Sequence, residues 1–162
     1  MNLKTIIIYY TKTGHTRDAA EDIAAGMEKN QVHPEIKNCQ EIKYRDLADY
    51  DLILVGSPCH AGSTAPLFSG IARPLESFLK SIPKDFLQKK KAAAFSVNAG
   101  LGAKKTVESL EKLLKRAGAV VVYSPGPAVR AGAPLSLWRG PDYSPRDKDK
   151  LQRFGSEIAK NK

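Results

Sequence analysis

Short apolar runs alternate with longer amphipathic stretches along this chain, and this alternation limits the folds that it can adopt. Residues 6–8 are three isoleucines, a β-branched run typical of a buried strand. Beyond a polar turn, Ala20, Ile23 and Met27 recur at helical spacing. The same change of period predicts four more strands, over residues 35–38, 52–56, 92–97 and 119–123.

Helices are expected between these strands and after the last one. Residues 67–79 have helical periodicity with a break expected at Pro74, and residues 107–117 have the same periodicity without a break. Ser144 is expected to cap a final helix that has Pro145 in its first turn. Five strands alternating with helices predict an α/β protein whose mostly parallel sheet is covered on both faces. Such a sheet binds its ligand at the carboxyl ends of the strands.

The length of 162 residues fits one compact domain, so we expect residues 1–162 to form a single unit. Cys39 and Cys59 form neither a CxxC pair nor a His-spaced ligand set, which argues against a disulfide scaffold and a zinc module. This cysteine usage fits a reducing cytoplasm. The apolar run over residues 3–10 is too short to span a bilayer and has no cleavage sequence, so membrane insertion is not expected.

The chain carries a net charge of +9, and the positive excess lies in its second half. Residues 84–116 hold nine Lys and Arg against three Asp and Glu, with the densest run at residues 89–91. A solvated surface is the simplest interpretation, and docking of an acidic partner is the alternative. Nucleic acid is a weaker candidate, because no aromatic pattern for base stacking accompanies the charge.

The segment after the first predicted strand has the composition of an anion-binding loop. It consists of Thr11, Lys12, Thr13, Gly14, His15 and Thr16, and a helix follows directly. Gly14 permits close approach of the backbone, while hydroxyls and successive N–H groups can face phosphate oxygens at the positive end of the helix dipole. The loop is neither a Walker A nor a GxGxxG motif. A structural capping turn would have the same composition, so this loop alone does not decide between the two interpretations.

This loop has the pattern Thr-x-Thr-Gly-x-Thr, which resembles the phosphate-binding signature of the flavodoxin family. Two later segments agree, because residues 51–58 are similar to the family's third strand and turn, and residues 95–100 are similar to its fourth. The resemblance implies a flavodoxin-like three-layer sandwich with a five-stranded parallel sheet in the order 2-1-3-4-5. It also implies flavin mononucleotide (FMN) as the cofactor.

The resemblance assigns three segments to FMN, the first around its phosphate and the other two beside its isoalloxazine ring. They are Thr11, Lys12, Thr13, Gly14, His15 and Thr16; Ser57, Pro58, Cys59, His60, Ala61 and Gly62; and Asn98, Ala99, Gly100, Leu101 and Gly102. Lys12 occupies a variable position of the family pattern. Many flavodoxins flank the ring with Trp and Tyr, whereas this chain offers His60 and Leu101, so weaker stacking on the ring is expected.

Three side chains near these segments have more than one interpretation. His60 would stack on the flavin, bond to it or move protons, or else lie solvated in its loop. Cys59 fits close packing of a small residue better than a reactive thiol. Trp138, the only tryptophan, would cover the flavin edge or pack against the last helix.

The resemblance implies an FMN-dependent flavoprotein that carries electrons between redox protein partners, which the basic surface suggests are acidic. Lys104 and Lys105 are the cations expected nearest the flavin, where they would make its most negative reduction potential less negative. The alternative is an oxidoreductase that reduces quinones or other small acceptors, and a cofactor-free interaction or nucleic-acid module is a third hypothesis. The sequence shows no paired catalytic carboxylates, no Ser-His-Asp order and no clustered metal ligands, so no catalytic residue and no metal are assigned.

Overall fold

The computed structural model of the protein describes residues 3–59, 70–99, 102–132 and 140–161, and at its centre is a parallel sheet. The main strands are β1 (Thr5–Tyr9), β2 (Glu35–Asn38), β3 (Leu52–Pro58), β4 (Lys91–Asn98) and β5 (Val120–Tyr123). They lie in the order β2-β1-β3-β4-β5, and every neighbouring pair is parallel. This confirms the fold class and the strand order predicted from the sequence.

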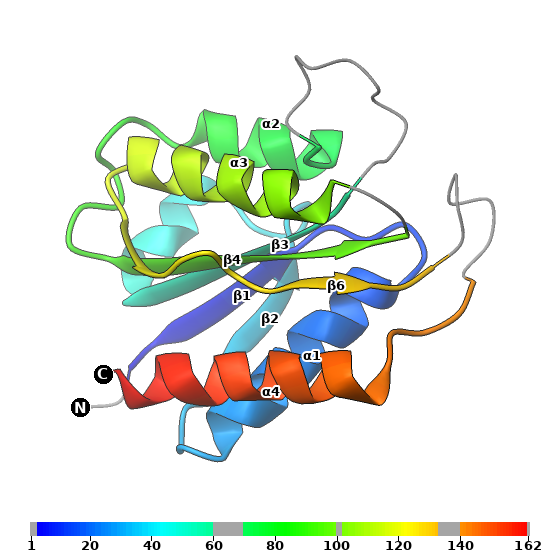
Figure 1. Ribbon diagram of the computed structural model, residues 1–162. Helices are drawn as coiled ribbons and strands as arrows, with labels where there is room; N and C mark the ends of the chain where they lie inside the picture. Colours follow the sequence, from blue (N-terminus) through cyan, green and yellow to red (C-terminus); the bar gives the residue numbers. More distant parts are fainter. Residues whose placement is uncertain (1–2, 60–69, 100–101, 133–139, 162) are drawn as a thin grey trace.

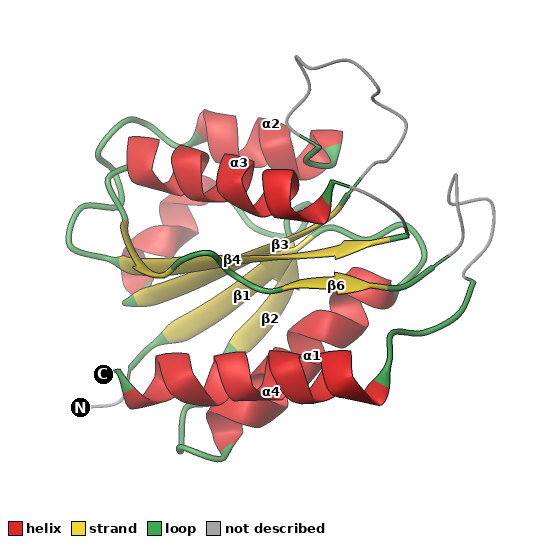
Figure 2. Cartoon of the chain, viewed as in Figure 1, coloured by secondary structure: helices red, strands yellow, loops and turns green. Residues whose placement is uncertain are grey.

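Helices cover both faces of the sheet, as Figure 1 and the colouring of Figure 2 show. α1 (His15–Glu28) and α4 (Pro145–Lys160) pack on one face. α2 (Arg73–Ser81), α3 (Ala103–Arg116) and the 3-10 helix η1 (Tyr44–Asp49) pack on the other. None of the helices in the described ranges combines the length and the hydropathy that a transmembrane span requires.

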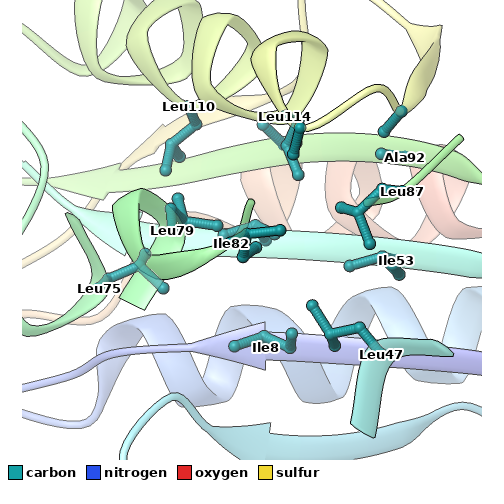
Figure 3. Close-up of a cluster of buried hydrophobic side chains, with 14 of the residues drawn as sticks. Ile8, Leu47, Ile53, Leu75, Leu79, Ile82, Leu87, Ala92, Leu110 and Leu114 are labelled. Atoms are coloured by element: carbon teal, nitrogen blue, oxygen red, sulfur yellow. The ribbon is translucent and has the colours of Figure 1, made fainter. Parts of the chain in front are cut away.

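The isoleucines of β1 divide between the two buried clusters that these helices form. Ile6 and Ile8 point into the cluster below α2 and α3, which also holds Leu110 (Figure 3). Ile7 points the other way, into the cluster that contains Ile23 of α1. All three are fully buried, because successive side chains of a strand alternate between faces and helices cover both faces of this sheet.

The sheet continues beyond the last predicted strand into a sixth, β6 (Ala128–Arg130), which pairs with the carboxyl half of β4. Between β5 and β6 the backbone packs so closely against β4 that only glycine fits at position 126. A Cβ there would lie 1.7 Å from the carbonyl oxygen of Ala94. The buried carboxylate of Glu111 accepts hydrogen bonds from Ser124 Oγ at 2.6 Å and from the Gly126 N–H at 3.1 Å. The sequence did not predict β6, because two prolines in this segment remove backbone donors and resemble a loop.

Pro74 starts a helix and does not break one. α2 begins at Arg73 with Pro74 in its first turn, where proline's missing N–H costs nothing. The expected break within residues 67–79 is therefore wrong for the part that the structure describes, and residues 67–69 lie outside it. The predicted cap of the last helix is confirmed, because Ser144 Oγ accepts from the Asp147 N–H at 3.1 Å.

Some of the basic residues of the second half serve the fold. Lys90 Nζ donates to the carbonyl oxygens of Ala48 and Tyr50, at 2.6 and 2.7 Å, where η1 ends. The Arg116 guanidinium donates to three carbonyls at the end of α2, the shortest contact being 2.9 Å to Ile82. Cations at these positions donate to carbonyls at helix ends, where the helix itself runs out of backbone donors and where its dipole is negative. The densest lysine run is therefore not wholly a solvated surface.

Candidate cofactor site

The three predicted cofactor segments start at one edge of the sheet, because the strands that lead into them are parallel and in register. Tyr9 at the end of β1 pairs with Gly56 of β3, and Pro58 at the end of β3 pairs with Val97 of β4. The three predicted cofactor segments begin at or beside these residues. The fold thus places them at the edge where open α/β sheets bind ligands.

Gly14 gives the first loop a backbone shape that suits an anion. Its φ of 100° and ψ of −17° lie in the left-handed region, which glycine adopts at low cost. The Gly14 N–H donates to Thr11 Oγ1 at 2.8 Å and closes the turn. The first hydrogen bond within α1 joins the Asp18 N–H to the Gly14 carbonyl at 3.0 Å, so the preceding amides point out of the positive end of the helix.

The N-cap residue of α1 is Gly14, which has no side chain to cap the helix. The backbone cradle, the helix dipole and the neighbouring threonines therefore fit the phosphate of a nucleotide. Thr16 is buried, Thr11 and Thr13 are half-buried, and Lys12 is exposed, as expected for a variable position. We predict that the backbone and the threonine hydroxyls would make the phosphate contacts.

His15 turns its imidazole toward a carboxylate. Its side chain is 5% exposed, and Nδ1 lies 3.4 Å from Asp142 Oδ1. The backbone N–H of His15 lies at the start of α1, where it suits a phosphate, and the contact of His15 with the cofactor stays a prediction. No sequence pattern predicts this contact, because Asp142 lies far from His15 along the chain.

A second contact fixes the segment before α4 against α1. The hydroxyl of the half-buried Tyr143 donates a hydrogen bond to the Asp22 carboxylate. Burial first, and then this hydrogen bond, raise the pKa of the Tyr143 phenol well above its ordinary value. Just before it, the Gly132 N–H donates to the Pro141 carbonyl at 2.8 Å, which closes the base of the connection between β6 and α4. Trp138 lies outside the described residues.

The second predicted segment starts with Ser57, which lies within β3 and whose hydroxyl the fold itself uses. Ser57 is fully buried, its Oγ donates to the Pro58 carbonyl at 2.8 Å, and it accepts from the Ala72 N–H at 3.0 Å. Its hydroxyl therefore anchors the start of α2. Pro58 and Cys59 are half-buried at the site edge. The rest of this predicted segment, His60, Ala61 and Gly62, lies outside the described residues.

The third loop lies directly against the second. Gly102 precedes α3 with a φ of 102°, and a Cβ there would lie 3.2 Å from Cys59 Sγ. Asn98 is largely buried, and its carbonyl accepts from the Ala131 N–H at 2.8 Å. Ala99 is half-buried, whereas Gly100 and Leu101 lie outside the described residues. The contact of Cys59 with Gly102 agrees with a packing role for this small side chain.

The two cysteines differ in environment. Cys39 is 4% exposed, and burial raises the pKa of its thiol to about 11. A thiol with such a pKa is protonated and unreactive at neutral pH. Cys59 is half-buried at the carboxyl edge. The structure thus separates one cysteine of the core from one at the candidate site.

A protein-family model described as a flavodoxin domain matches residues 6–125. The chain belongs to the flavodoxin family. A flavodoxin of Maridesulfovibrio salexigens is 30% identical over 162 residues, covering 96% of this chain and 97% of the relative. Two solved flavodoxins share the fold of this flavodoxin. Flavodoxin 2 of Bacillus cereus has a TM-score of 0.75 and 21% identity, and the match covers 98% of this chain and 99% of that one. A flavodoxin from the domain Archaea has a TM-score of 0.72 and 23% identity, and the match covers 98% of this chain and 97% of that one.

A more distant similarity covers only part of the chain. Protoporphyrinogen IX dehydrogenase [quinone] of Escherichia coli is 24% identical over 84 residues, which is 52% of this chain and 46% of that enzyme.

Flavodoxins bind FMN, so membership of the family confirms the predicted cofactor. The Gly14 cradle at the start of α1 fits its phosphate. The individual contacts of the three loops with FMN stay predictions.

Proposed function

We propose that this flavodoxin carries electrons between acidic redox proteins, with FMN held by the three loops at the carboxyl edge of the sheet. Bound FMN supplies the one-electron chemistry, and the chain binds and orients it. The observation that carries the proposal is the convergence of the left-handed Gly14 turn with the loops after β3 and β4. The proposal includes a single domain that works in the cytoplasm, where Cys39 and Cys59 stay reduced.

The outer face of α3 supports the choice of acidic partners. Lys104, Lys105, Lys112 and Lys115 are all exposed on this helix, against a single exposed carboxylate, that of Glu108. α3 begins directly after the third loop, so the basic face starts beside the proposed flavin site. A surface of one sign there would speed encounters with proteins of opposite charge.

Reduction of a small acceptor is the second candidate, favoured by the partial similarity to the Escherichia coli dehydrogenase whose name includes a quinone. The imidazole and carboxylate of His15 and Asp142 lie at the phosphate loop and not at the segments assigned to the isoalloxazine ring, so the carrier is the better supported proposal.

Rates of electron transfer at different salt concentrations test this proposal. Protein reduced photochemically is mixed in a stopped-flow instrument with an acidic rubredoxin, with the basic cytochrome c or with menadione. We expect transfer to the acidic protein to slow by about tenfold as salt rises from about 0.02 to 0.3 M, because screening removes attraction, and transfer to cytochrome c to change in the opposite direction. If the protein instead reduces menadione rapidly over many turnovers with a regenerating donor, and transfers electrons slowly to either protein, its function is the reduction of small acceptors.

The charge of α3 is also expected to act on the flavin itself. Replacing Lys104 and Lys105 by Gln should make the most negative reduction potential of the bound FMN more negative by about 45 mV per charge before screening, for a separation of ~8 Å and an effective dielectric of ~40. The fully reduced flavin is anionic, so each lost cation destabilises it. Spectroelectrochemical titration measures the shift.

The matched control replaces Lys112 and Lys115 by Gln. These lysines are equally exposed on α3 but lie about 12 Å further along the helix from the site. Equal potentials for both double variants and the parent protein would show that the first-turn lysines do not act on the flavin.

A further inference from the structure

Three side chains of metal-ligand type converge at the start of α1. They are His15, Asp18 and Asp142, and each offers one atom such that the three atoms lie within 4.8 Å of one another. The cluster adjoins the phosphate loop through His15, whereas Asp18 and Asp142 lie outside the three segments assigned to FMN. It therefore offers a second site, distinct from the FMN site.

Two of these side chains are brought together by the helix itself. His15 and Asp18 are three residues apart in the first turns of α1, a spacing that places them on one helix face. The spacing alone is common in helices and specifies no metal. The third group is what distinguishes this arrangement.

Asp142 comes from the segment before α4, which passes beside the start of α1 (Figure 1). Its position has support from both neighbours in the chain. The Pro141 carbonyl accepts from the Gly132 N–H at 2.8 Å, and the Tyr143 hydroxyl donates to Asp22 of α1. The carboxylate is thus presented to His15 by a segment that is held independently of the His15–Asp142 contact.

The distance between the first two ligand atoms suits a small divalent ion. His15 Nδ1 and Asp142 Oδ1 are 3.4 Å apart. Two ligands at ~2.1 Å from a tetrahedral zinc ion are separated by about 3.4 Å, and by about 3 Å around an octahedral ion. The imidazole is 5% exposed and the Asp142 side chain is 73% exposed, so the cluster combines a buried nitrogen ligand with an opening to solvent for water ligands.

We infer that His15, Asp18 and Asp142 bind one divalent first-row transition ion, with water completing its coordination. One imidazole and two carboxylates suit Zn²⁺, Mn²⁺ or Fe²⁺, whereas Ca²⁺ and Mg²⁺ prefer oxygen ligands alone. The ion would neutralise two carboxylates and join the segment before α4 to α1. Occupancy of the site would therefore stabilise the connection between β6 and α4.

Binding of Mn²⁺ to the FMN-loaded protein tests the inference. Free Mn²⁺ gives a six-line electron paramagnetic resonance signal that is lost when the ion binds, and oxidised FMN adds no signal. We expect one Mn²⁺ per chain, displaced by one Zn²⁺, and selective broadening of the His15 ring resonances in the NMR spectrum. Asp142→Asn and Asp18→Asn should each weaken binding at least tenfold, because each removes a charged ligand.

Asp149→Asn is the matched control, since Asp149 is an exposed carboxylate of α4 outside the cluster. All variants are compared with FMN bound, so any attraction of Mn²⁺ to the phosphate is common to them. Unchanged binding in Asp142→Asn, or no loss of free signal at millimolar Mn²⁺, would overturn the inference. Asp142 is largely exposed, so its variant keeps the test decisive even if Asp18→Asn does not fold.

Discussion

Replacing Gly14 by Val is expected to lower the affinity for FMN by at least ~100-fold. Gly14 has a φ of 100°, a conformation that a β-branched residue adopts only at a cost of ~1–2 kcal/mol or more. The valine side chain would also keep the phosphate from approaching the backbone at the start of α1. Quenching of FMN fluorescence during titration of flavin-free protein measures the affinity.

Gly118→Ala separates this local effect from a general loss of stability. Gly118 also has a left-handed φ, 92°, and a Cβ there would lie 2.8 Å from the Cα of Asp85. Gly118 follows the end of α3, at the opposite end of the helix from the third loop. We expect this variant to be less stable yet to bind FMN normally. Full FMN affinity in Gly14→Val would refute the assigned phosphate loop.

Replacing Gly155 by Ala is expected to lower the free energy of unfolding by about 2–3 kcal/mol. In an exposed helix this change would add about 1 kcal/mol of stability, because alanine is the better helix former. Here α4 crosses α1 backbone to backbone: a Cβ at Gly155 would lie 2.1 Å from the Ile23 carbonyl oxygen, and one at Gly26 would lie 2.0 Å from that of Gln152. The helices must therefore separate to admit even a methyl group.

Urea unfolding at a fixed FMN concentration measures this effect, because ligand binding itself shifts the apparent stability. Asp149→Ala, at an exposed position of the same helix, is the control and should change stability by less than about 0.5 kcal/mol. A Gly155→Ala variant as stable as the parent protein would show that α1 and α4 do not pack as closely as described.

Local patterns in the sequence predicted most of the helices and strands. The isoleucines of β1 and the helical spacing of Ala20, Ile23 and Met27 predicted strand and helix correctly, because both faces of β1 and one face of α1 are buried. The strand order came from the family resemblance. β6 was missed because two prolines precede it, and because Glu111 of α3, which no local pattern connects with this segment, accepts hydrogen bonds from the turn before it.

The candidate site was predictable where it depends on one segment and not where it depends on several. The Gly14 turn follows from its own residues, since only glycine suits that backbone. The His15–Asp142 contact joins residues far apart in the chain, and no spacing rule reports it. Ser57 lies near the carboxyl end of β3, but its hydroxyl accepts a hydrogen bond from the backbone at the start of α2. This use of the hydroxyl depends on how α2 packs against β3, which the sequence does not show.

Calorimetric titration of the flavin-free protein with FMN and with riboflavin tests the central claim most directly. The two flavins share the isoalloxazine ring and differ in the phosphate, whose charge-assisted hydrogen bonds contribute about 1.5–3 kcal/mol each. A phosphate cradle at residues 11–16 predicts one FMN per chain and an affinity for riboflavin at least ~100-fold lower. Equal affinity for the two flavins, or no heat from either, would contradict the account.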